Sequence, residues 1–208
     1  MNPIRYLLFI LIISLTLNGC ATLDKDECST ANWELIGLGD GHNGYKITRL
    51  DQHRQACAEY KVVPDVKAYN KGRDRGLLKY CRASNGYDEG ISGAKYAGVC
   101  PAKLEPAFLD AYRYGSKLYS LKSDITDLEA KLAQAQESRR RLETDAQHNR
   151  FVIDNKRNTP ETRARLTEQL RQLDQAIGKL TVTIQQLRES IRIRTDEFRK
   201  MKSFNPYR

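Results

Sequence analysis

The sequence Asp154-Asn155-Lys156-Arg157-Asn158-Thr159-Pro160 interrupts two long helical patterns and decides the fold of the C-terminal half of the chain. Threonine followed by proline is typical of a helix start, with Thr159 as N-cap and Pro160 in the first helical position. In a helix interior the same proline costs about 3 kcal/mol. The stretch therefore predicts a turn followed by a new helix.

Apolar residues recur at alternating intervals of three and four residues on both sides of this break. Before it the series is Leu118, Leu121, Ile125, Leu128, Leu132, Ala135, Arg139, Leu142 and Ala146. After it the series is Leu166, Leu170, Leu173, Ile177, Leu180, Ile184, Leu187, Ile191, Arg194, Phe198 and Met201. This spacing is that of a coiled-coil seam. We predict an antiparallel coiled-coil hairpin in residues 105–208.

The register of the hairpin follows from matching three-residue intervals on one helix with three-residue intervals on the other. Opposed residue numbers then sum to 312 or 319, and we choose 312 because it keeps Pro160 inside the second helix. Leu128 then faces Ile184, and the long stem of Arg194 covers Leu118. The alternative is one continuous helix that dimerises in parallel, which the proline and the weak helix formers of the break disfavour.

The whole chain, with 40% apolar and 29% charged residues, has the composition of a soluble protein, but its first twenty residues differ from this average. Arg5 precedes an apolar run of about 18 Å as a helix, too short for a bilayer core of about 30 Å. This pattern is typical of a signal peptide, here residues 1–19. Leu17-Asn18-Gly19-Cys20 resembles the lipobox of bacterial lipoproteins, which predicts a lipidated Cys20. The alternative is an ordinary cleaved signal with Cys20 as a structural cysteine.

Four further cysteines lie in residues 20–104, namely Cys28, Cys57, Cys81 and Cys100. An even number in an exported chain predicts two disulfides, and the spacing lacks the close pairs of a zinc site, so we expect no metal and no cofactor. If the helices on either side of Pro64 are antiparallel, Cys81 lies about 24 Å from the turn, which excludes a bond to Cys57. Two connectivities remain. We choose Cys28–Cys57 and Cys81–Cys100 because they close the shorter loops.

Residues 20–104 are expected to form a small, glycine-rich helical domain, which usually needs disulfides for stability. Apolar spacing predicts helices over 48–60 and 65–81 and a shorter one from Asn32. Gly39-Asp40-Gly41-His42-Asn43-Gly44 matches a dinucleotide-binding pattern but has no strand before it, so we interpret its glycines as turns or close helix contacts. His42 and His53 with Asp40 and Asp51 are a weak candidate for an acid–base pair.

Several motifs of this region occur together in one family. They are Trp33-x-x-Ile36-Gly37-x-x-Asp40-Gly41, Cys57-Ala58, Tyr69-x-x-Gly72-Arg73-x-x-Gly76-Leu77, Asn85-Gly86-Tyr87-x-x-Gly90 and Gly98-Val99-Cys100-Pro101. Over about residues 28–120 the chain resembles a family of bacterial lipoproteins known only as a domain of unknown function, number twenty-seven ninety-nine. The resemblance implies a small cysteine-containing domain on an envelope lipoprotein with no established activity.

The chain is basic, with a formal net charge of +9. An exported protein does not meet nucleic acid, so we expect an acidic envelope component or protein partner instead. The candidate contacts in the hairpin are Arg139, Arg140, Arg141, Arg150, Lys156, Arg157, Arg163 and Arg165. The alternative interpretation is a solvated coiled-coil surface.

The sequence favours a non-enzymatic lipoprotein of unknown activity, because no nucleophile and base stand out together. Since Ala21 is not the aspartate associated with inner-membrane retention, we expect a lipid anchor in the outer membrane, facing the periplasm. The expected role is structural or docking. The alternative is a binding module for an envelope polymer, a glycan or lipopolysaccharide, with a stacking surface of Tyr69, Tyr80, Tyr87 and Tyr96.

Overall fold

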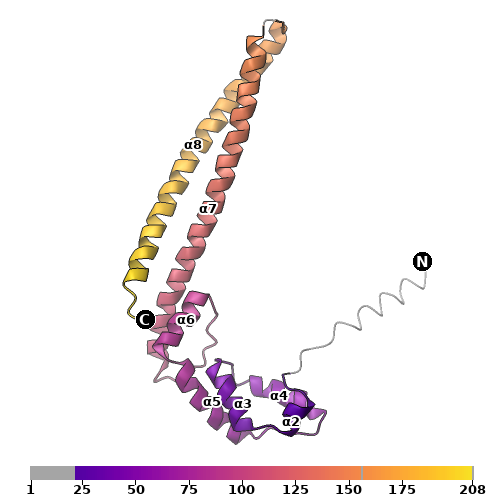
Figure 1. Cartoon of the computed structure of the whole chain (residues 1–208), viewed down its shortest axis with the longest axis vertical. Coiled ribbons are helices and arrows are strands. Elements are labelled where there is room, and N and C mark those ends of the chain that lie inside the picture. The colour runs from indigo at the N-terminus through magenta and orange to yellow at the C-terminus, as the bar shows by residue number, and fades with distance from the viewer. Residues whose placement is uncertain (1–21, 156, 208) are drawn as a thin grey trace, which may run out of the picture. The chain divides into compact units, whose positions relative to one another are not determined.

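The structure is a computed structural model that describes residues 22–155 and 157–207 (Figure 1). The described part is helical and contains no strand. Its helices are α2 (Lys25–Ser29), α3 (Trp33–His42), α4 (Arg49–Ala58), α5 (Val66–Tyr80), α6 (Ala83–Ser92), α7 (Glu105–Asp154) and α8 (Pro160–Ser203). Among them, none is both long and apolar enough to span a bilayer. The predicted signal peptide and Cys20 lie outside the described residues, as does Lys156.

Helices α3 and α5 pack against each other through glycines spaced four residues apart on each. A side chain at Gly37 would overlap the backbone carbonyl of Tyr69, and one at Gly41 would overlap that of Arg73. Conversely, a side chain at Gly72 would overlap the carbonyl of Glu34. Such overlap forces backbones apart, so only glycine permits this approach. Within the dinucleotide-like string, Gly41 therefore serves helix packing and Gly44, with a φ of 68°, lies in a turn, as we predicted, whereas nothing lies within 4 Å of a side chain added at Gly39.

Both predicted disulfides are confirmed. Cys28 bonds Cys57, with Cα atoms 5.5 Å apart, within a buried cluster that includes Trp33 and Tyr69. The bond between Cys81 and Cys100 lies in a second buried cluster, together with Leu77, Tyr80 and Phe108. Each bond closes a loop of 19 or 29 residues, which restricts the unfolded chain and contributes about 3 to 3.5 kcal/mol.

The helix starts agree with the sequence. The Asp65 carboxylate accepts from the backbone N–H groups of Lys67 and Ala68 at 3.0 Å, and Asn32 caps α3. Thr159 accepts from Thr162 at 3.3 Å, with Pro160 in the first turn of α8. These side chains satisfy amide groups that have no partner inside the helix. The turn predicted at residues 154–160 therefore does start a new helix.

Helix α6 was not predicted, because its glycine, asparagine and serine residues are weak helix formers. It forms through tertiary packing. A side chain at Gly86 would overlap the carbonyl of Phe108, so α6 approaches the first turns of α7 closely. Phe108 is fully buried, and its ring lies 5.3 Å from that of Tyr80.

The chain divides into two compact units. The first comprises the described residues up to Glu89 together with Ala94–Tyr112, and the second comprises Gly90–Gly93 and the residues from Arg113 onward. The first unit thus extends past residue 104, where we placed the end of the domain, and takes in the start of α7. Phe108 and Ala111 are its fully buried residues from this helix.

In the second unit, the two long helices α7 and α8 pack together (Figure 1). The residues of both apolar series are buried or half-buried, except Arg194. Leu118 and Leu121 are at most 1% exposed, and Ile184 is 3% exposed. Arg194 is instead exposed and lies 3.3 Å from Glu197. This ion pair with a neighbour on its own helix keeps the guanidinium in water, and the contact of its stem with Leu118 stays a prediction.

The ion pairs between α7 and α8 agree unequally with the predicted register. Lys117 lies 3.2 Å from Glu197, within two residues of a sum of 312, and Arg150 lies 2.7 Å from Asp174. A sum of 312 places residue 162 opposite Arg150, so Asp174 would be twelve residues, or about 18 Å, further along α8. The ion pair near the turn therefore departs from the predicted register.

The glycine contact between α3 and α5 gives a stability prediction with a matched control. We expect Gly37→Ala to lower the free energy of unfolding by about 3 kcal/mol, since the added methyl group has no space. Gly39→Ala on the same helix should raise it by up to about 1 kcal/mol, because nothing lies within 4 Å of the new methyl group and alanine favours helix. Urea unfolding followed by circular dichroism measures both. Equal effects of the two variants would contradict the packing argument.

Candidate functional site

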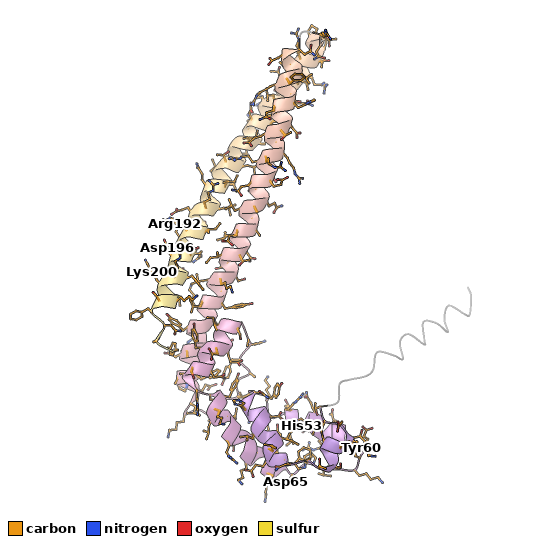
Figure 2. The ribbon with its side chains drawn as sticks, in the orientation of Figure 1. His53, Tyr60, Asp65, Arg192, Asp196 and Lys200 are labelled. Carbon is orange, nitrogen blue, oxygen red and sulfur yellow. A yellow bond between two sulfur atoms is a disulfide. The ribbon has the colours of Figure 1, made fainter. Side chains whose placement is uncertain are left out.

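Asp40 and His53 are buried in the first unit, only 8% and 3% exposed. Figure 2 labels His53, which belongs to α4. The Nε2 of His53 lies 2.8 Å from Oδ2 of Asp40. The hydroxyl of Tyr69, which is fully buried, donates to the same carboxylate oxygen at 2.7 Å. A buried carboxylate is costly unless it is hydrogen-bonded, and here it accepts from two donors. This group joins α3, α4 and α5.

Thr22 extends the network to the start of the described chain. Its Oγ1 lies 2.8 Å from Nδ1 of His53. A carboxylate only accepts hydrogen bonds, so the proton of a neutral His53 is on Nε2, and Nδ1 accepts from the hydroxyl of Thr22. Thr22 is two residues after Cys20. The network therefore ties the segment next to the predicted lipidation site to the folded domain.

Helix packing explains why these residues meet. Asp40 precedes Gly41, which approaches the backbone of Arg73 on α5, and Tyr69 lies one turn before Arg73. Close approach of α3 and α5 thus brings the carboxylate within reach of the phenol. Burial raises the pKa of Tyr69 above the usual value, and the hydrogen bond to Asp40 raises it further. The phenol stays protonated and donates at neutral pH.

Of the weak acid–base candidates, the structure brings together only Asp40 and His53. His42 is exposed, and Asp51 pairs with Arg54 at 2.6 Å. Threonine, histidine and aspartate occur in order, as in a hydrolase triad, but His53 is buried. Thr22, Asp40 and His53 do not line the surface hollows beside Asn32, Tyr119 and Asp145. The hydrogen bonds of the network join the segment before α2 to α3, α4 and α5. Within the described residues, no three His, Cys, Asp or Glu side chains are grouped to hold a metal.

The tyrosines that we proposed as a stacking surface are core residues. Tyr69, Tyr80 and Tyr87 are at most 5% exposed, and Tyr96 is half-buried. The hydroxyl of Tyr96 donates to Glu105 at 2.9 Å and accepts from the backbone N–H of Cys100. That prediction of a platform is wrong, because a glycine-rich domain with few aliphatic residues uses its tyrosines to fill the core.

Several basic candidates for an anionic partner have acidic neighbours within the chain. Arg140 and Arg141 each lie 2.9 Å from Glu137, and these two hydrogen bonds lower the pKa of Glu137 to about 2. Arg139 lies 3.3 Å from Glu143, and Arg150 pairs with Asp174. The basic run at 139–141 is therefore largely a solvated surface of intrahelical ion pairs, which was our alternative interpretation.

The turn between α7 and α8 differs from the rest of this surface. Arg157 and Arg165 are exposed, Arg163 is half-buried, and none of the three forms an ion pair within the described part of the chain. Phe151 in the last turn of α7, six residues before Arg157, is 73% exposed. The sequence did not predict Phe151 as a site residue because it falls outside the apolar series. Exposed aromatic and arginine side chains are enriched in binding surfaces.

The comparison with known families now adds to this description. Residues 32–117 match the family described as Protein of unknown function (DUF2799), which confirms the resemblance carried by the glycine and cysteine motifs. No curated protein and no solved structure matches the chain significantly. The matched segment contains Asp40, His53 and Tyr69. Thr22 and most of α7 and α8 lie outside it.

The network predicts a stability change at alkaline pH. The raised pKa of Tyr69 contributes stability that is present below about pH 10, where an unfolded tyrosine ionises, and is lost as the pH rises toward the folded value. We expect Tyr69→Phe to lower the free energy of unfolding by about 1 to 2 kcal/mol at neutral pH and to make its loss above about pH 10 less steep. Chemical unfolding at several pH values measures this. Tyr45→Phe, at a 44% exposed position, is the control and should match wild type. A Tyr69→Phe slope identical to wild type would refute the assignment.

Proposed function

We propose that this protein is a non-enzymatic lipoprotein of the outer membrane, which holds a disulfide-stapled domain at the periplasmic surface and extends a helical arm as a docking element. The observation that carries the anchoring part is the hydrogen bond between Thr22 and His53. A buried histidine, itself fixed by Asp40, binds the third residue of the predicted mature chain. This hydrogen bond holds the domain at a fixed place relative to a lipid anchor on Cys20. A segment that carried no anchor would not require such a contact.

The arm is proposed to be an antiparallel coiled-coil hairpin with opposed residue numbers that sum to about 319. Contacts that support this join the start of α7 to the end of α8, where the hydroxyl of Tyr114 donates to the carbonyl of Met201 at 2.6 Å. The ion pair of Arg150 with Asp174 joins the other ends. In this register Ala135 faces Ile184, and both are buried, at 9% and 3% exposed. A fixed hairpin of this length presents its turn about 50 Å from the start of the seam.

The turn of the arm is the proposed docking surface. Along α8, charged side chains pair with neighbours, as in the case of Arg192, which lies 2.6 Å from Glu189 and 3.4 Å from Asp196 (Figure 2). Such exposed pairs leave little charge for a partner. Phe151 and Arg157 at the turn offer instead an apolar contact beside a free cation. An acidic protein partner fits this chemistry.

A second candidate function, binding of an envelope glycan, now depends on Tyr119 rather than on the buried tyrosines. Tyr119 is 48% exposed, and its ring packs against Gly93. Gly93 has a φ of +77°, a conformation that favours glycine, so no side chain stands between its backbone and the ring. A hollow of about 410 Å³ beside it is also lined by Lys122 and Asp127. An aromatic ring with polar groups at its edge suits a sugar ring.

Lipidation is tested by labelling. With Cys20 as the acceptor, wild type expressed in a Gram-negative host should incorporate palmitate and fractionate with the outer membrane. Cys20→Ala should do neither, because the only proposed anchor is lost. Equal labelling of the two proteins, or an unchanged membrane fraction, contradicts the anchoring proposal.

Cysteine pairs test the hairpin and its register together. In the mature chain without Cys20 and with its native disulfides formed, Ala135→Cys with Ile184→Cys should crosslink efficiently within one molecule. The control pair, Leu128→Cys with Ile184→Cys, corresponds to a sum of 312 and should crosslink poorly. Mass spectrometry of the crosslinked peptides and of the intact protein distinguishes these results. Crosslinks formed only between molecules would overturn the hairpin, and a preference for the control pair would overturn the register.

Docking by the turn is tested with a photoreactive amino acid in living cells. At position 151 it should give a discrete crosslinked product that disappears when Arg157→Glu reverses the neighbouring charge. At Val182, which is 54% exposed on α8 and remote from the turn, the same probe should not give this product. The same product from both positions, or its persistence with Arg157→Glu, would show that the turn is not the docking surface.

A further inference from the structure

The loop between α4 and α5, residues 59–65, combines a packed side with an exposed apolar side chain. Tyr60 and Val62 pack against the cluster of Cys28 and Cys57, and so does Leu23. Val63, the next residue, is 80% exposed. Because Tyr60 and Val62 pack inward, the side chain of Val63 faces solvent beside a packed segment. This exposure is unfavourable in solution.

The same loop contains a backbone conformation that usually requires glycine. Lys61 has a φ of 61°, the left-handed region. It ends α4 in a Schellman motif, in which the N–H of Val62 donates to the carbonyl of Cys57 at 3.2 Å. Glycine is the usual residue at this position because a β-carbon is disfavoured there. A lysine in its place brings a positive charge next to Val63.

This loop lies close to the predicted lipid anchor. Thr22 is bonded to His53 on α4, and Leu23 packs in the cluster that holds Tyr60 and Val62. A hydrogen bond to Glu59 raises the pKa of Tyr60, and the negative charge of Asp24 adds to this effect, which places the phenol near the anchored segment. Cys20 precedes Thr22 by two residues, which span at most about 7 Å. A lipidated Cys20 therefore keeps the bilayer surface near this side of the domain.

The geometry points to a membrane-contacting loop: with Cys20 lipidated, Val63 enters the headgroup region of the bilayer and Lys61 lies at the phosphate level. This inference rests on the lipid anchor of the proposed function. Glu59 and Asp24 lie near the loop, so attraction to anionic lipid is largely cancelled. The contact is therefore mainly apolar, and we expect it with zwitterionic and with partly anionic lipids.

Tryptophan quenching in vesicles tests the contact. The full-length lipidated protein is reconstituted into phosphatidylethanolamine–phosphatidylglycerol vesicles, with or without phosphatidylcholine brominated on its acyl chains. Wild type, with its one buried Trp33, gives the background. Val63→Trp should add emission that is shifted to shorter wavelength and loses most of its intensity with brominated lipid.

Leu78→Trp is the matched control. Leu78 is 58% exposed on α5, but twelve residues, or about 18 Å, beyond Val66 at the start of that helix. Its added emission should not be quenched. Equal quenching at both positions, or quenching at neither in protein that floats with the vesicles, overturns the inference. Protein that fails to float contradicts instead the lipid anchor, so the two failures are distinguishable.

Thr22→Val tests whether the hydrogen bond to His53 positions the loop. The variant keeps the size of the side chain but removes the hydroxyl. Combined with Val63→Trp, it should reduce quenching by brominated lipid, while flotation and circular dichroism stay unchanged. Undiminished quenching would show that Thr22 does not position the loop and would overturn that part of the inference.

Discussion

The close crossing of α3 and α5 is the constraint on which the first unit depends. Gly37 and Gly41 on one helix meet the backbone of the other, which contributes Gly72 in return. With backbones this near, Asp40 can reach Tyr69, and the carboxylate is buried with two donors. The polar network is thus a consequence of a packing contact that any β-carbon would prevent.

The network in turn explains why His53 is buried, because both of its ring nitrogens have hydrogen-bond partners. Asp40 fixes the ring and its proton, and the remaining nitrogen binds Thr22. These hydrogen bonds connect the core to the segment that follows the predicted lipidation site. We regard the same groups as the means by which an anchored domain keeps one side toward the bilayer.

The arm uses a different principle of stability. Its apolar series is buried between two helices, and its many charges pair locally, as Arg140 and Arg141 do with Glu137. Charges that pair with neighbours on the same helix keep a long helix pair soluble and leave little unpaired charge for a partner to bind. At the turn, Phe151 is exposed, and this is the docking surface that we propose. The surface residues along such an arm can therefore change without changing the docking surface that we propose at its turn.

The helical class, the turn at Thr159 and Pro160, both apolar series and the two disulfides follow from the sequence, because periodicity, capping and loop length are local properties of the chain. The pairing of α7 with α8 does not follow from it, since a turn can be placed asymmetrically and a pattern with period seven fits its partner in more than one way. The burial of Tyr69 and Tyr80 and the hydrogen bond of Thr22 to His53 come from the tertiary structure, because contacts between residues far apart in sequence leave no periodic signal.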